Sequence, residues 1–175
     1  GGDRRRVGTV CGTLKAEAAI VALSEEFEER GYEVPVMLSV TVTDRSGRTL
    51  SGQTIDAFYV STRHALPFSV GINCALGARE IRPYLAELSN QASIFVSCYP
   101  NAGLPNEFGD YDELPDETGQ LLREFAESGL VNIVGGCCGT TPDHIRAIAQ
   151  AVSGLPPRVV PTPDPRTQFA GLAVL

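Results

Sequence analysis

Hydrophobic and polar positions divide the chain into two kinds of segment. Five short runs are almost continuously apolar, which is typical of strands that are covered on both faces. Because these runs lack strict alternation, they favour a parallel sheet. The predicted strands fall within Val7–Val10, Val34–Val42, Phe68–Cys74, Ile94–Tyr99 and Leu130–Val134.

The segments between these runs carry apolar residues at helical spacing. Ile81, Leu85 and Leu88 recur at intervals of three and four residues, which places them on one face of a helix. Thr141 is a suitable N-cap and is followed by Pro142, a residue favoured at the first helical position. The predicted helices cover residues 14–30, 78–90, 117–128 and 142–154, with a further helix within 53–64.

The resulting order, a strand followed by a helix five times, requires a parallel sheet with right-handed crossovers. Two architectures satisfy it: an open doubly wound sheet, and part of a (β/α)8 barrel. A complete barrel usually needs about 250 residues, whereas this chain has 175. The pattern of apolar positions alone does not separate the two.

The composition changes after Leu155, where prolines become frequent and apolar residues few. Such a segment is predicted to be a semi-extended linker or tail outside the core. We therefore divide the chain into a folded part, residues 1–154, and a tail, residues 155–175. The prolines concerned are Pro156, Pro157, Pro161, Pro163 and Pro165.

Charge and cysteine content narrow the class of protein. With 14 basic and 21 acidic residues, the net charge is −7, which argues against a nucleic-acid or anionic-membrane surface. No apolar run approaches the roughly 18 residues of a membrane span, and no N-terminal signal pattern is present. The five cysteines, an odd number, indicate a reducing compartment and a cytoplasmic location.

Three of these cysteines follow predicted strands. Cys74 ends the third apolar run, and Cys137 and Cys138 come just after the fifth. Since the carboxyl ends of parallel strands share one edge, the three thiols are expected on the functional rim. Glycines around the adjacent pair give its backbone the freedom to turn both thiols toward one ion. Three thiolates with a fourth position left open indicate a catalytic zinc site. The alternative is that these cysteines are buried and pack as small apolar side chains.

Other candidates carry weaker signals. Gly135–Gly136 precedes a helix and could cradle a phosphate, but the chain has neither a Walker lysine nor a GxGxxG motif. His144, in the first turn of the last helix, is expected to face solvent. A solvated acidic loop is expected at Asp110, Asp112 and Glu113. Packing as small apolar side chains is expected for Cys11 and Cys98.

Two blocks of sequence resemble a known family. Residues 71–77 read GINCALG, and residues 134–145 read VGGCCGTTPDHI. Both resemble the zinc-dependent homocysteine S-methyltransferases. Residues 43–54 (TDRSGRTLSGQT) and 99–112 (YPNAGLPNEFGDYD) look like the homocysteine module of cobalamin-dependent methionine synthases. The resemblance runs from about residue 7 to residue 158.

The resemblance implies a partial (β/α)8 TIM barrel, with this chain contributing approximately strands 4–8 and their helices. It resolves the choice between the two architectures in favour of the barrel. It also implies a longer polypeptide with cobalamin and folate modules, the tail leading toward the folate-type module. Methylcobalamin would be carried on another of these modules.

By the same resemblance, Cys74, Cys137 and Cys138 are the zinc ligands. The implied substrate contacts are three residues beside these cysteines in the two blocks: Asn73, Gly135 and Gly136. The implied reaction transfers a methyl group from methylcobalamin to a zinc-activated homocysteine thiolate, giving methionine. Two alternatives remain: a betaine- or S-methylmethionine-type homocysteine methyltransferase, and a truncated inactive fragment.

The chain departs from the family at the end of its first predicted strand. The family pattern there is Glu-Thr-Val/Ile-Phe-Asp-Thr, whereas residues 8–13 read GTVCGT. The glutamate is implied to hold the ammonium group of the substrate. With Gly8 and Gly12 in place of the two acids, this chain lacks that contact.

Overall fold

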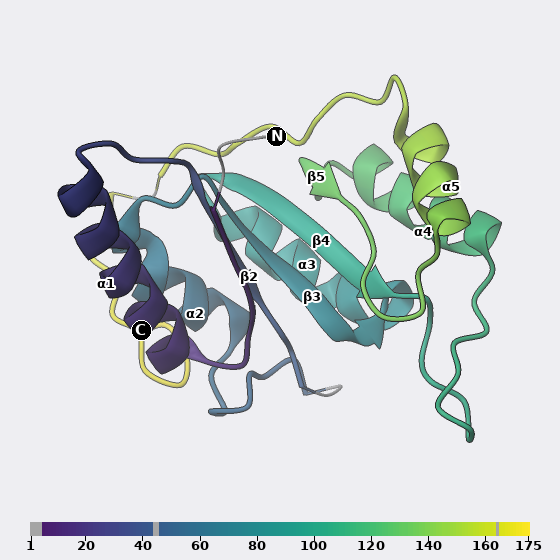
Figure 1. Ribbon diagram of the computed structural model, residues 1–175, viewed down its shortest axis with the longest axis horizontal. Coiled ribbons are helices and arrows are strands. Elements are labelled where there is room, and N and C mark those ends of the chain that lie inside the picture. Colours follow the sequence, from purple (N-terminus) through teal and green to yellow (C-terminus); the bar gives the residue numbers. More distant parts are fainter. Residues whose placement is uncertain (1–4, 44–45, 164) are drawn as a thin grey trace.

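The computed structural model describes residues 5–43, 46–163 and 165–175. Its strands form one parallel sheet in the order β1-β2-β3-β4-β5, so neighbours in the sequence are neighbours in the sheet (Figure 1). The prediction of five strands is confirmed, although the last one is shorter than its apolar run. The strands are β1 (Arg5–Val10), β2 (Val36–Val40), β3 (Ser69–Gly77), β4 (Phe95–Asn101) and β5 (Ile133–Val134).

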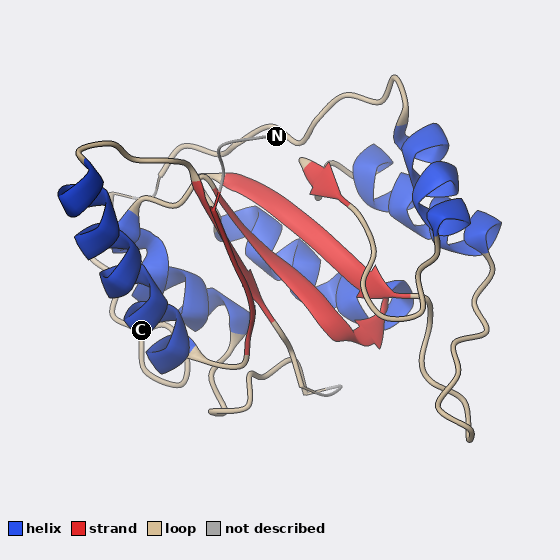
Figure 2. Ribbon diagram, in the orientation of Figure 1, coloured by secondary structure: helices blue, strands red, loops and turns tan. Residues whose placement is uncertain are grey.

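A helix follows each strand, as predicted (Figure 2). The segment 53–64 does contain a helix, which continues into a short 3-10 turn at Arg63–Ala65. No helix among the described residues is long and apolar enough to cross a membrane. The helices are α1 (Thr13–Arg30), α2 (Ile55–Thr62), α3 (Ala78–Gln91), α4 (Pro115–Glu127) and α5 (Pro142–Val152).

This sequential strand order identifies the architecture. Right-handed crossovers between successive neighbours place every helix on the same face of the sheet. A doubly wound sheet instead reverses its order and carries helices on both faces. The chain therefore folds as an arc of a (β/α)8 barrel, and the expected fold class is confirmed.

The two faces of the arc differ in chemistry. In one row of the sheet Leu38, Val70 and Val96 are paired in register, and all three are fully buried in the apolar face that the helices cover. In the next row Ser39, Gly71 and Ser97 are paired, and they lie on the opposite face. The inner face of the arc is therefore lined with small and polar residues.

Close packing on this inner face explains a glycine of the first sequence block. A Cβ atom at Gly71 would lie 2.0 Å from Ser97 Oγ and 2.2 Å from the Ser97 carbonyl oxygen. Since a backbone atom cannot yield as a side chain does, only glycine fits between β3 and β4 at this position.

The segment 155–175 is mostly exposed, but a buried side chain, Arg158, anchors it to the barrel. Arg158 is 4% exposed, and its guanidinium donates to the carbonyls of Ser89 (2.6 Å) and Ile94 (2.9 Å). The tail then runs back toward α1 and α2 (Figure 1), where Gln53 Nε2 donates to the Gly171 carbonyl at 2.9 Å. Hydrogen bonds to backbone carbonyls, which composition does not reveal, hold it there.

Candidate metal centre

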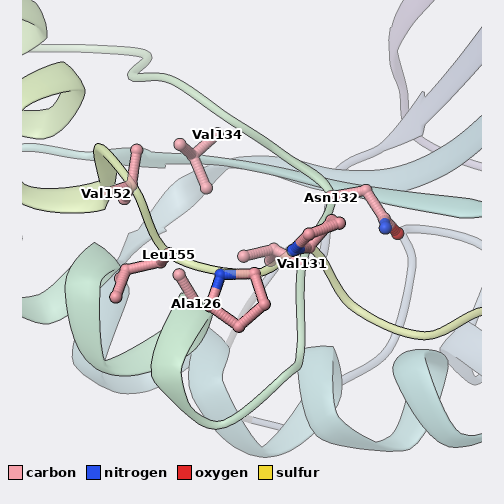
Figure 3. A pocket seen from close by; sticks show the side chains of 8 residues that line it. Ala126, Val131, Asn132, Val134, Val152 and Leu155 are labelled. Atoms are coloured by element: carbon pink, nitrogen blue, oxygen red, sulfur yellow. The ribbon is translucent and has the colours of Figure 1, made fainter.

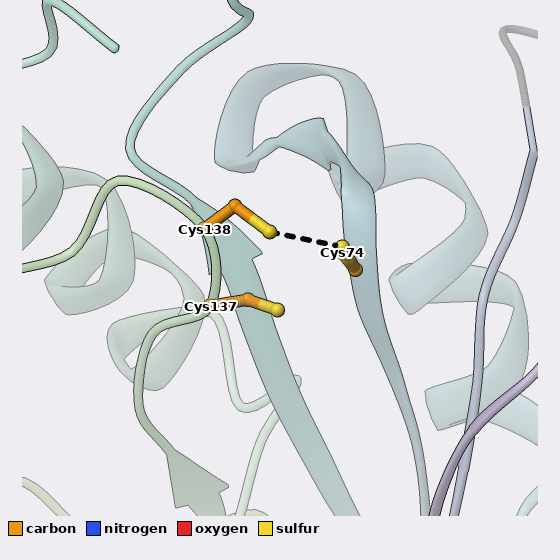
Figure 4. A group of neighbouring side chains, drawn as sticks. All are labelled: Cys74, Cys137 and Cys138. Carbon is orange, nitrogen blue, oxygen red and sulfur yellow. Dashed lines mark hydrogen bonds between the residues drawn. The ribbon is translucent and has the colours of Figure 1, made fainter. Parts of the chain in front are cut away.

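Three thiols meet at the carboxyl edge of the sheet. The Sγ atoms of Cys74, Cys137 and Cys138 all lie within 4.8 Å of one another, and those of Cys74 and Cys138 are 3.4 Å apart (Figure 4). Cys74 comes from β3, and the other two come from the loop between β5 and α5. Cys138 is exposed, whereas Cys74 and Cys137 are half-buried, so the group opens to solvent on one side.

Unusual backbone geometry places Cys74. Cys74 and Ala75 have φ angles of 61° and 59°, both in the left-handed region. The register between β3 and β4 breaks over the same stretch, between Asn73 and Gly77. Left-handed geometry costs a residue with a Cβ atom about 1–2 kcal/mol, and such strain is characteristic of functional sites.

This strain gives a first prediction. Ala75→Gly should raise the free energy of unfolding by about 0.5 kcal/mol, because glycine adopts a positive φ without cost. Ala92→Gly is the control: Ala92 has a φ of −70°, so the same change there should destabilise the protein. Urea unfolding measures both, and an Ala75→Gly variant that is destabilised as much as Ala92→Gly would show that Ala75 carries no strain.

Hydrogen bonds to β4 hold the loop that carries the cysteine pair. The Cys137 amide donates to the Pro100 carbonyl at 2.8 Å, and the Ala102 amide donates to the Cys138 carbonyl at 2.9 Å. The Cys138 amide donates to Asn101 Oδ1 at 3.1 Å. The end of β4 therefore fixes both neighbouring cysteines, although it contributes no thiol.

The glycines beside the pair allow its tight turn. Gly139 has a φ of +76°, and a Cβ atom there would lie 2.4 Å from Cβ and Cγ of Tyr111. A Cβ atom at Gly136 would lie 2.4 Å from Thr140 Cγ2. The Thr140 hydroxyl closes the turn by donating to the Cys137 carbonyl at 2.7 Å. Larger residues at either glycine would displace the loop.

The residues expected to contact the substrate lie beside the cluster. Asn73 is fully buried, accepts a hydrogen bond from Ser39 Oγ at 2.5 Å and donates to Thr41 Oγ1 at 3.5 Å. Gly135 donates its amide to the Cys98 carbonyl at 3.1 Å. A substrate contact by Asn73, Gly135 or Gly136 stays a prediction.

A family comparison gives these observations a context. A family model described as homocysteine S-methyltransferase matches residues 3–152. The chain belongs to the homocysteine S-methyltransferase family. The match covers all five strands and all five helices described above, and both sequence blocks that contain the three cysteines. A role in methylating the thiol of homocysteine follows from this membership.

One residue of the second family block differs from expectation. His144 is buried rather than facing solvent. Its Nδ1 atom accepts a hydrogen bond from the Thr141 amide at 3.2 Å, and Nε2 donates to the Glu113 carbonyl at 2.9 Å. His144 therefore caps α5 and joins it to the loop after β4, and it contributes no ligand to the cluster.

The loop after β4 supplies a side chain that the sequence did not single out. Tyr111 packs on Gly139, the residue after Cys138. Desolvation raises the pKa of this phenol, and the charge and hydrogen bonding of Cys138 raise it further. Asp110 and Asp112, two residues of the predicted acidic loop, are exposed, as expected for a solvated face.

The other two cysteines lie apart from the cluster. Cys98 is fully buried on the helix-covered face, and desolvation strongly raises the pKa of its thiol. Cys11 lines a cavity of about 220 Å³ at the end of β1, together with Leu14 and Leu50. Asp44 and Arg45, within the family-like segment 43–54, lie outside the described residues.

A separate cavity of about 120 Å³ lies between β5 and the helices α4 and α5 (Figure 3). Its lining is mainly apolar and includes none of the cysteines, so it offers no donor set for catalysis. It is lined by Ala126, Val131, Asn132, Val134, Val152, Leu155, Pro156 and Pro157.

Proposed function

We propose that this chain is the zinc-binding part of a homocysteine methyltransferase module of the methionine synthase type. The observation that supports the proposal is the convergence of Cys74, Cys137 and Cys138 at the carboxyl edge of the barrel. In this role the three thiolates would hold zinc, which would bind the thiol of homocysteine. The methyl donor is methylcobalamin, carried on another module.

The geometry of the cluster fits zinc. A thiolate binds zinc at about 2.3 Å, so two sulfurs of a tetrahedral site lie about 3.8 Å apart. The Cys74–Cys138 separation of 3.4 Å and the upper limit of 4.8 Å within the cluster bracket this value. Three soft sulfur donors also favour zinc over magnesium or calcium, which prefer oxygen ligands.

Zinc would supply one chemical effect here: it would favour the thiolate form of homocysteine, whose free thiol has a pKa of about 8.5. The protein supplies the geometry. The amide bonds from Cys137 and Cys138 to the end of β4 fix the ligand loop, and the exposed side of Cys138 leaves an approach for the methyl donor. The thiol proton can leave to solvent on the same side.

The division of the chain is part of the proposal. Residues 1–154 are the C-terminal part of the homocysteine-binding barrel, and residues 155–175 lead toward a folate-type module. The outer edge of β1 supports this division, since β1 pairs only with β2 in the described sheet. An open strand edge is normally paired or covered in a native protein, so further barrel strands would complete it.

The methyl donor separates this proposal from its closest alternatives. The complete polypeptide that contains this chain, loaded with zinc, should form methionine from homocysteine and methylcobalamin. Methionine is measured by mass spectrometry, with betaine and S-methylmethionine as the competing donors. Formation from either of these donors alone would assign the chain to the alternative type of homocysteine methyltransferase, and no formation from any donor would identify an inactive member.

A further inference from the structure

Asn101, the last residue of β4, lies between the two segments that carry the cysteines. On one side its backbone pairs with Gly77 of β3, where the register resumes after the irregularity that begins at Asn73. On the other side its Oδ1 atom accepts a hydrogen bond from the Cys138 amide at 3.1 Å. One residue therefore contacts both the strand that bears Cys74 and the loop that bears Cys138.

The side chain of Asn101 has little freedom to move. The residue is 2% exposed. The backbone around it is held as well, because the Gly103 amide donates to the Asn101 carbonyl at 2.9 Å. A buried acceptor on a fixed backbone defines one direction in which the Cys138 amide can point, since hydrogen bonds weaken steeply when they are misaligned.

Two neighbouring cysteines need a special backbone to present both thiols to one ion, because successive side chains of an extended segment point to opposite sides. Three hydrogen bonds hold this pair against the end of β4. Two of them join backbone atoms: the Cys137 amide to the Pro100 carbonyl, and the Ala102 amide to the Cys138 carbonyl. The third ends on Asn101 Oδ1, so it alone of the three depends on the identity of a side chain.

Cys138 is the member of the cluster that most needs such a restraint. It is exposed, whereas Cys74 and Cys137 are half-buried, so packing does little to fix its side chain. Its Sγ atom nevertheless lies 3.4 Å from that of Cys74. Because the bond to Asn101 orients the peptide group that carries the Cys138 side chain, its loss would let the thiol turn toward solvent.

We propose that Asn101 is a positioning residue for the metal centre: its Oδ1 atom orients the Cys138 peptide so that the Cys138 thiol turns toward the other two. The inference rests on the proposed function, because it concerns the three cysteines as zinc ligands. It extends that function by giving a residue without a thiol a share in the zinc affinity. Outer partners of metal ligands typically contribute about 10–100-fold to the affinity.

The test compares wild type with Asn101→Ala, which removes the acceptor, and with Asn101→Asp, which restores one at the same position. The reduced proteins are loaded with Co²⁺ under anaerobic conditions, because each thiolate bound to cobalt adds charge-transfer absorbance in the near ultraviolet. In Asn101→Ala we expect this absorbance per cobalt to fall by about one third, as three bound thiolates become two, and the zinc affinity to fall about tenfold. Asn101→Asp should recover most of both.

Asn132→Ala is the matched control. Asn132 Oδ1 accepts the Val96 amide at 3.0 Å, so it makes the same kind of hydrogen bond near the start of β4, the opposite end of the strand. A loss of stability alone would appear in both alanine variants, whereas the cobalt absorbance and the zinc affinity should fall only in Asn101→Ala.

The possible results separate this inference from the proposed function. If wild type binds one zinc per chain and Asn101→Ala keeps the wild-type absorbance per cobalt, the role of Asn101 is wrong while the proposed function stands. Equal falls in Asn101→Ala and Asn132→Ala would also contradict the role. If wild type takes up no zinc, the proposed function itself is wrong, and the role of Asn101 fails with it.

Discussion

Replacing Cys137 by serine is expected to lower the affinity of the chain for zinc on the order of a thousandfold. The serine hydroxyl stays protonated at neutral pH, so it cannot replace a thiolate as a ligand. The two remaining thiols, of Cys74 and Cys138, would then hold the ion without the third donor that lies within 4.8 Å of both. Competition with a chromophoric chelator, in reduced and anaerobic protein, measures this change.

Cys98→Ser is the matched control for this experiment. Cys98 is fully buried on β4, and it is paired in the sheet with Ile72 and Val134 of the helix-covered face. We expect this variant to bind zinc as wild type does, although it is less stable because a hydroxyl replaces a buried thiol. Unchanged zinc affinity in Cys137→Ser would show that the pair does not act as ligands.

The cysteine cluster could be predicted from the sequence because its position follows from one rule of parallel sheets. Cys74 ends an apolar run, Cys137 and Cys138 come just after another, and parallel strands bring their carboxyl ends to one edge. The same rule did not identify Asn101 or Tyr111 as residues of the site, because their contacts form where a loop crosses the end of β4. It also gave no sign of the left-handed backbone at Cys74, which depends on the register break beside it.

Two buried side chains were missed for the same physical reason. Arg158 lies in a segment whose composition predicted a tail outside the core, and His144 was expected to face solvent from its position in the first turn of a helix. Each is buried by polar contacts: Arg158 with carbonyls after α3, and His144 with the Glu113 carbonyl. Hydropathy patterns detect burial driven by apolar area, so they miss side chains that are buried through hydrogen bonds.

Arg158→Met should lower the free energy of unfolding by about 3 kcal/mol and release the tail. The guanidinium donates to the carbonyls of Ser89 and Ala92, at the C-terminal end of α3, where helix carbonyls lack intrahelical partners and favour a cation. It also donates to Ser89 Oγ at 2.8 Å. Methionine fills much of the same volume but leaves these buried acceptors without a donor.

Urea unfolding measures the loss, and limited proteolysis within residues 155–175 measures the release of the tail. Arg146→Met is the control, because the ion pair of Arg146 with Asp143 is exposed and such pairs contribute about 0–1 kcal/mol. Equal losses in the two variants would contradict the anchoring role of Arg158. Arg158 contacts the end of α3 and Ile94, before β4, whereas the cysteines lie at the carboxyl edge of the sheet. A released tail should therefore leave zinc affinity unchanged. A fall in zinc affinity in Arg158→Met would instead show that the tail stabilises the barrel as far as the metal centre.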